Sequence, residues 1–288
     1  MSIRIILAPV FGADSDARSL EAAFGVAQRF GAHLTGLFVR VDPRDAIRVI
    51  GEGVSPAVID QLTQAAEAEM DRRSAAARAT FEAACGKSGA AISDQPSAAG
   101  AASAAWVELT GRRDEMIPRK ARVSDLTVLC RPDENAPPEL GTVLEATLFG
   151  AGRPLLIVPL QGAPSIGRTV AIAWNDSAEA ARAVAGARPF IEAAGAVHVL
   201  STKTWRTAAD VGLELVQYLE SRGTACTRRE VASEGGPVGA ALLDAAAAAG
   251  ADLLVMGGYG RTRLSELVLG GVTRHVLAHS RLPILISH

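Results

Sequence analysis

The apolar run Leu253-Leu254-Val255-Met256 leads directly into Gly257-Gly258-Tyr259-Gly260. A polar amphipathic stretch follows, and Gly270-Gly271-Val272-Thr273 then begins a predicted helix. The glycines therefore form the pattern G-x2-G-x9-G-G, between the end of a buried strand and the N-terminus of a helix. Glycine lets the backbone approach a ligand closely, and a helix N-terminus presents unpaired N–H groups. This arrangement indicates a site for phosphate groups.

Composition limits the classes of protein that this chain can belong to. At 288 residues it is long enough for two ordinary domains. Its 29 basic and 31 acidic residues give a net charge of −2, so no bulk field attracts nucleic acid or an anionic membrane. The three cysteines form no C-x-x-C pair, which argues against a disulfide framework and a zinc site. With no signal peptide and no apolar stretch of about 18 residues, we expect a cytoplasmic protein.

The two halves of the chain repeat one pattern of strands and helices. Each half is predicted to run β-α-β-(helix)-β-α-β-α-β, which is typical of a parallel sheet with right-handed crossovers. The matching segments are 3–9 and 169–174, 14–30 and 177–194, 34–39 and 196–200, 124–129 and 251–256, and 152–158 and 281–286. The Gly/Pro segment 161–167 separates the halves. We therefore expect an α/β fold with two tandem domains, 1–161 and 168–288, each an open, mostly parallel five-stranded sheet with helices on both faces.

The halves differ in the helix that follows the second strand. In the first half, 55–86 is predicted to form one extended helix, with Ser55 as its N-cap and Pro56 at its first position. The second half has only the shorter helical stretch 208–222 at this place.

Two common nucleotide motifs are excluded. Arg263 stands where the dinucleotide pattern G-x-G-x-x-G needs its third glycine. Gly86-Lys87-Ser88 has Phe81 in place of the first glycine of a Walker A loop, and it follows a helix instead of a strand.

The chain resembles the universal stress protein family, in a tandem form with two family domains. The family motif G-x2-G-x9-G-[ST] is matched from Met256 through Pro283, and Asn175-Asp176-Ser177 fits the family's turn after the first strand. The loop 234–238 is similar to the family's loop after the third strand. The resemblance covers the whole chain as a fold, and in its motifs only about 168–288.

This resemblance implies an adenine-nucleotide site, for ATP with or without magnesium. The glycines would lie against the ribose and phosphates, Asn175 would read the adenine or ribose side, and Arg261 could contact a phosphate. The implied residues lie at strand carboxyl ends and at the start of the last helix, where open α/β sheets bind ligands. They are Asn175, Ser201, Thr202, Gly257, Gly260, Arg261, Gly270, Gly271, Val272 and Thr273.

Gly271 departs from the family motif, which prefers Ser or Thr at this position. A lost hydrogen bond to a charged group is worth about 1.5–3 kcal/mol. Affinity would then fall roughly ten- to hundredfold. The alternative is that these glycines serve only a tight turn and close helix packing.

The first half lacks the glycine loop. Its corresponding strand is followed by Cys130-Arg131-Pro132-Asp133-Glu134, and Pro9-Val10-Phe11-Gly12 replaces the polar turn. We therefore expect 1–161 to be a degenerate domain that does not bind nucleotide.

Other chemistry is weakly indicated. His275 and His279 have the i, i+4 spacing of metal ligands, but no Glu lies between them and no third ligand is evident, so no metal site is expected. Asp14 and Asp16 are interpreted as charges at a helix N-terminus, Ser177 as a helix N-cap, and Gly31 as the residue that stops the helix 14–30. The three cysteines are expected to be inert thiols. The tryptophans are interpreted as core or interface residues: Trp106, Trp174 and Trp205.

No catalytic residue is predicted, so we expect a stress-response protein that acts by ligand-dependent conformation or partner binding. A very slow ATP hydrolase and a non-binding scaffold stay open as alternatives. The family resemblance implies self-association through the last strand, here 282–287, which would make the two halves an intramolecular pseudo-dimer and allow a dimer of chains. No nucleic acid or membrane partner is expected.

Overall fold

The computed structural model describes residues 2–42, 56–97, 100–132, 138–163, 165–202, 211–232, 236–258 and 271–288. These residues form two compact units. We call 4–128 with 136–151 the N-terminal unit, and 1–3, 129–135 and 152–288 the C-terminal unit. The division does not follow the two halves of the sequence, because 129–135 and the last strand of the first half group with the second half.

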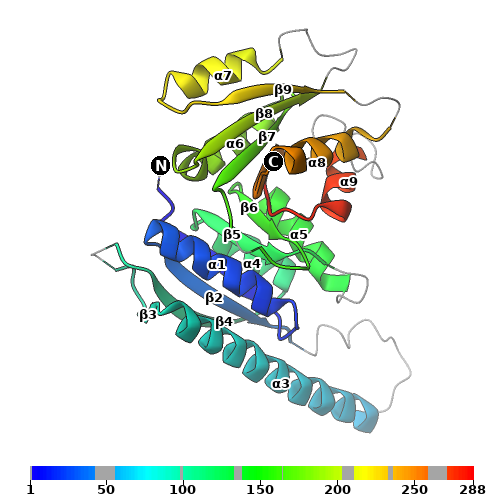
Figure 1. The fold of residues 1–288 in the computed structure, drawn as a ribbon. Coiled ribbons are helices and arrows are strands. Elements are labelled where there is room, and N and C mark those ends of the chain that lie inside the picture. Colours follow the sequence, from blue (N-terminus) through cyan, green and yellow to red (C-terminus); the bar gives the residue numbers. More distant parts are fainter. Residues whose placement is uncertain are drawn as a thin grey trace. The chain divides into compact units, whose positions relative to one another are not determined.

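The N-terminal unit is built on a parallel sheet with strand order β3-β4-β2-β1-β5 (Figure 1). Its central strands are buried apolar runs, as expected of a parallel sheet covered on both faces. The strands are β1 (Ile5–Val10), β2 (His33–Arg40), β3 (Ala91–Ile92), β4 (Ser103–Thr110) and β5 (Leu126–Cys130).

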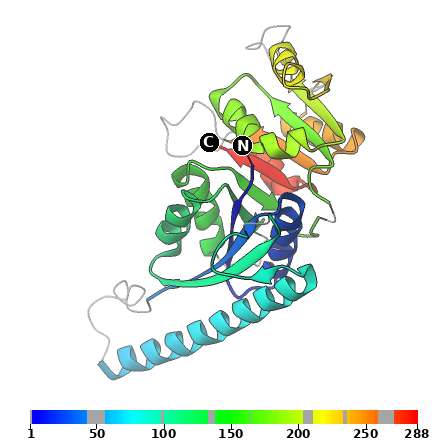
Figure 2. The same cartoon turned by 90° about the vertical axis from the view of Figure 1, so that its left-hand side faces the viewer.

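Helices cover both faces of this sheet. The pairs α1 with α3 and α4 with α5 pack together, and they lie on opposite faces in Figures 1 and 2. Gly31 ends α1 in the left-handed conformation, with φ 61°, which confirms the predicted stop. The helices are α1 (Asp16–Phe30), α3 (Pro56–Ser88), α4 (Arg113–Ala121) and α5 (Pro138–Gly150).

The predicted long helix is observed, while its predicted N-cap, Ser55, lies outside the described residues. Helix α3 has 33 residues, from Pro56 to Ser88. Its C-terminal half is anchored in the core by Phe81, whose ring centroid lies 5.3 Å from that of Trp106. Trp106 is therefore a packing residue, as expected.

In the C-terminal unit the strand order is β6-β11-β10-β7-β8-β9. Its strand pairs are parallel, except that β6 and β11 are antiparallel, with Leu156 opposite Leu285. The last strands of the two halves thus pair with each other, as the pseudo-dimer prediction requires. The strands are β6 (Leu155–Val158), β7 (Thr169–Trp174), β8 (Ala196–Thr202), β9 (Thr227–Val231), β10 (Leu253–Gly257) and β11 (Ile284–Ser287).

The helices of this unit also follow the predicted order. Helix α6 packs on β10 and β11, and α8 packs on α9. The predicted helix 208–222 is observed only as α7, and 203–210 lie outside the described residues. The helices are α6 (Ala178–Glu192), α7 (Leu213–Glu220), α8 (Val238–Ala248) and α9 (Gly271–His279). None of the helices in the described ranges has the length and apolar character needed to span a membrane.

Candidate functional site

The end of strand β10 passes unusually close to helix α6. A Cβ atom on Gly257 would lie 2.5 Å from the backbone nitrogen of Ala180 and 2.7 Å from the carbonyl carbon of Glu179. No side chain fits at such distances. The first motif glycine therefore lets the strand end touch the first turn of α6, and part of its role is packing.

The turn after β7 begins α6. Asp176 adopts a left-handed conformation, with φ 59°, which Asp tolerates better than most residues. The Oδ1 of Asn175 accepts hydrogen bonds from the hydroxyl of Ser177 at 2.7 Å and from its backbone N–H at 3.3 Å. The Oγ of Ser177 in turn accepts a hydrogen bond from the N–H of Ala180 at 3.1 Å, which confirms Ser177 as the N-cap.

The side-chain oxygen of Asn175 is thus occupied by hydrogen bonds within its own turn. Its side chain is exposed, and its Nδ2 group has no partner among the described residues. The amide nitrogen is free to donate to a ligand at the carboxyl end of β7.

The neighbouring strand brings Ser201 to the same edge. It lies opposite Trp174 in the β7–β8 register and is only 2% exposed. Thr202 ends β8, but its side chain lies outside the described residues.

Helix α9 starts at this edge as well. Because β10 and β11 pair in parallel, the connecting helix must run back along the sheet, so its N-terminus lies on the side of the strand carboxyl ends. A Cβ on Gly271 would have no atom of the described residues within 4 Å, so this position faces open space between them. The first N–H groups of a helix lack intrahelical partners and favour an anion.

The other implied residues divide into two groups. Val272 is half-buried, and Thr273 is only 6% exposed, so its hydroxyl is less accessible than the position of Gly271. Gly260, Arg261 and Gly270 lie outside the described residues. The described edge thus brings together Asn175, Ser201, Gly257 and the start of α9.

Two titratable side chains beside this edge, Glu179 and His288, were not identified as site residues from the sequence. Burial raises the pKa of Glu179, but its own backbone N–H and the charges of Arg182 and His288 stabilise the carboxylate. The net result is a pKa below its usual value. The Nδ1 of His288 lies 3.0 Å from the carbonyl oxygen of Gly258. His288 could not be identified from a local sequence motif, because its contact with Gly258 joins two residues that are far apart in the sequence.

Arg131, from the loop after β5, supports the far end of α9. Its Nη1 donates to the carbonyl oxygens of Ala278 at 3.0 Å and Ser280 at 2.8 Å, with a longer contact of 3.4 Å to that of Leu277. A cation at the last carbonyls complements the negative end of the helix dipole. Arg131, which follows β5 in the half that lacks the glycine motif, therefore caps the C-terminal end of α9.

No metal centre is formed by the described residues. His275 and His279 stack with ring centroids 4.2 Å apart, and the Nδ1 of His279 lies 2.9 Å from the carbonyl oxygen of His275. Within the parts of the chain that the structure describes, no cluster of three potential ligands occurs. Cys85 and Cys130 are buried, and burial raises the pKa values of Cys85 and Cys226, which fits inert thiols.

Comparison with known proteins identifies the family of the second half. The model of the universal stress protein family matches residues 168–288. A universal stress protein from Archaeoglobus fulgidus DSM 4304 has a similar fold over 98% of this chain and 97% of its own, with a TM-score of 0.68 and 15% identity.

Two Pseudomonas aeruginosa structures share the fold at lower scores. A protein of unknown function from strain PAO1 matches over 99% of this chain and 92% of its own, with a TM-score of 0.53 and 18% identity. A protein from strain UCBPP-PA14 matches over 99% and 93%, with a TM-score of 0.55 and 18% identity. No curated protein sequence matches the chain.

Proposed function

Residues 168–288 form a domain of the universal stress protein family, and we propose that this domain binds an adenine nucleotide, ATP, at the carboxyl edge of its sheet. The observation that carries the proposal is the convergence of two helix N-termini at this edge. Gly257 brings β10 against the first turn of α6, and α9 starts on the same side at Gly271. Together these ends would supply backbone N–H groups and positive dipole ends for phosphates.

Each described residue has a defined task in this proposal. The Nδ2 of Asn175 would donate to the adenine or ribose side, and Ser201 would line the base. The open space at Gly271 leaves room for a phosphate next to the backbone of α9. Magnesium would be held by phosphate oxygens and water, as is common for this ion, since the described residues offer no cluster of three ligands.

The proposed role is a stress response in the cytoplasm through a nucleotide-dependent conformation. At the described part of this edge, Ser177 lies beside the Glu179 carboxylate, but its hydroxyl donates to Asn175 and its Oγ caps α6. The carboxylate of Glu179 pairs with Arg182 at 3.1 Å and helps shape the turn. Binding is therefore favoured over turnover.

A charge placed at Gly271 gives the sharpest test. In Gly271→Asp, the new carboxylate would enter open space, and an acidic residue at a helix N-terminus is compatible with folding. The same carboxylate would repel phosphates. Calorimetric titration with ATP and magnesium should show saturable binding to the native chain and at least a tenfold weaker Kd in the variant.

The matched control is Gly25→Asp in α1. This helical glycine also faces open space, but it belongs to the N-terminal unit. Its ATP affinity should equal that of the native chain. The proposal would be refuted by the absence of binding at millimolar ATP, or by an equal loss of affinity in both variants.

A further inference from the structure

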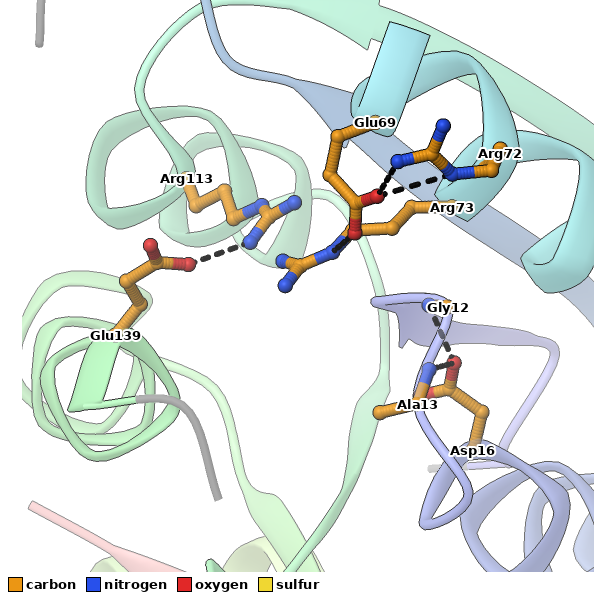
Figure 3. A network of polar contacts seen from close by, with 8 residues as sticks. All are labelled: Gly12, Ala13, Asp16, Glu69, Arg72, Arg73, Arg113 and Glu139. Carbon is orange, nitrogen blue, oxygen red and sulfur yellow. Dashed lines mark hydrogen bonds and ion pairs between the residues drawn. The ribbon is translucent and has the colours of Figure 1, made fainter. Parts of the chain in front are cut away.

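Two arginines converge at the carboxyl edge of the N-terminal sheet, in the half of the chain whose sequence lacks the glycine motif. Figure 3 shows the guanidinium groups of Arg113, the first residue of α4, and Arg73, from α3, directed toward the same space. Burial lowers the pKa of Arg113, the Glu139 carboxylate raises it, and the charge of Arg73 lowers it further. An anion between the two guanidinium groups would relieve this repulsion.

Arg113 is held rigidly but is not fully paired. It is only 6% exposed. Its Nε donates to the carbonyl oxygen of Val39 at 3.3 Å, and its Nη1 donates to Glu139 at 2.6 Å. Its guanidinium carbon lies 5.7 Å from the ring centroid of Phe11 and 6.0 Å from that of Phe38. Its Nη2 is buried and has no hydrogen-bond partner among the described residues.

Arg73 is also fixed in place and has donors to spare. Its Nε donates to one carboxylate oxygen of Glu69 at 3.0 Å, and Arg72 binds the other oxygen. Neither Nη group of Arg73 has a partner within the described part of the chain. The backbone of α3 packs closely against Gly12 here, since a Cβ on Gly12 would lie 2.6 Å from the carbonyl oxygen of Arg73.

The nearby carboxylates of Asp16 and Glu139 do not satisfy the Nη2 group of Arg113. Asp16 is 2% exposed, and its Oδ2 already accepts the backbone N–H groups of Gly12 at 2.7 Å and Ala13 at 2.9 Å (Figure 3). It also accepts the backbone N–H of Phe11 at 3.0 Å. Glu139 is 58% exposed and binds only the Nη1 side of Arg113. Neither carboxylate pairs with the Nη2 group.

We infer that the N-terminal unit binds a single phosphoryl group, as inorganic phosphate or a small phosphomonoester, between the Nη2 of Arg113 and the Nη groups of Arg73. Guanidinium groups match the geometry of phosphate oxygens and form strong charge-assisted hydrogen bonds with them. The flanking carboxylates offset most of the arginine charge, which favours one phosphoryl group over a triphosphate. The first half would therefore be a site of a different kind from the proposed nucleotide site.

Inorganic phosphate and glycerol 3-phosphate are the probes that test this inference. Calorimetric titration at constant ionic strength should show saturable binding of at least one of them, and the tighter probe identifies the source of the phosphoryl group. Arg73→Gln should weaken this binding at least tenfold. Arg73→Lys keeps the charge but loses the forked set of donors, so its affinity should lie between those of the native chain and of Arg73→Gln.

Arg78→Gln is the matched control, because Arg78 lies on the same helix and pairs with Glu82 at 2.9 Å on the exposed face. It should bind phosphate like the native chain, and so should Gly271→Asp, which separates this site from the nucleotide site. The inference fails if neither probe binds, if Arg73→Gln and Arg78→Gln lose affinity equally, or if a crystal grown in phosphate shows only water on the Nη2 of Arg113. The test uses variants of Arg73 because a substitution of the buried Arg113 would disturb folding.

Discussion

At position 257 the fold leaves no room for any side chain. The nearest backbone atoms of α6 would lie 2.5 and 2.7 Å from an added Cβ, both in rigid main chain. Gly257→Ala should therefore lower the free energy of unfolding by about 1–3 kcal/mol, through forced backbone shifts. Urea unfolding followed by circular dichroism measures this change.

Gly271→Ala is the control for this experiment. The added methyl group would enter open space, and replacing a helical glycine by alanine stabilises a protein by about 0.4–1 kcal/mol. Its unfolding midpoint should equal or exceed that of the native chain. Similar midpoints for both variants would show that Gly257 has no packing role.

Asp16 gives the N-terminal unit a pH dependence of its own. Burial raises its pKa from 3.8 to about 6, although the backbone N–H groups of Ala13, Phe11 and Gly12 and the charge of Arg113 oppose the shift. The folded state thus binds the proton more tightly than the unfolded state. The stability that the protonated Asp16 side chain contributes is full below about pH 4 and is lost as the pH rises through about 6.

The corresponding variant is Asp16→Asn, which keeps an oxygen for the three N–H groups and does not titrate. A shift of this size corresponds to about 3 kcal/mol. The stability of the native chain relative to the variant should therefore fall by roughly that amount between pH 4 and pH 7, as measured by urea unfolding at each pH. A constant difference across this range would contradict the assignment.

Local chemistry explains which residues could be interpreted from the sequence. Ser177 as an N-cap and Gly31 as a helix stop depend on their immediate neighbours, and both predictions are confirmed. Asp16 lies in the first turn of α1, as its interpretation as a charge at a helix N-terminus predicts, but its burial was not predicted. Arg113 was not singled out, since its contacts come from Phe11, Val39 and Glu139, which are far away in the sequence.

At the scale of elements, α9 is held at its C-terminal end by a residue from the other half of the sequence. Arg131→Ala would leave the carbonyl groups of Ala278 and Ser280 without their charged donor. Hydrogen bonds from a charged donor are worth about 1.5–3 kcal/mol, and the partial exposure of Arg131 reduces this to roughly 1–2 kcal/mol. Amide exchange of the α9 amides should accelerate accordingly, as measured by mass spectrometry.

Two variants control for this effect. Arg131→Lys keeps the cation near the helix end and should retain part of the protection. Arg274→Ala removes an exposed cation from α9 itself and should leave exchange at the C-terminal end unchanged. Unaltered exchange in Arg131→Ala would show that the helix end does not depend on this cap.

At the scale of the whole molecule, hydrophobic patterning predicted nearly all of the architecture. Buried runs such as 253–256 and their alternation with helices indicated parallel pairing of strands, and the described strand pairs are parallel except β6 with β11. The division into compact units was not predictable in the same way. It depends on β6, which ends the first half of the sequence but pairs with β11 at the edge of the second.

This pairing predicts how pieces of the chain behave. Without β6, the fragment 168–288 would expose the backbone groups of β11 that now pair with Ile157, Leu156 and Leu155. An unpaired apolar edge favours strand addition from a second molecule. We therefore expect 168–288 to self-associate, and 152–288, which keeps β6, to do so at least tenfold more weakly. Light scattering across a concentration series distinguishes the two, and a monomeric 168–288 fragment would show that β6 is not needed to cover this edge.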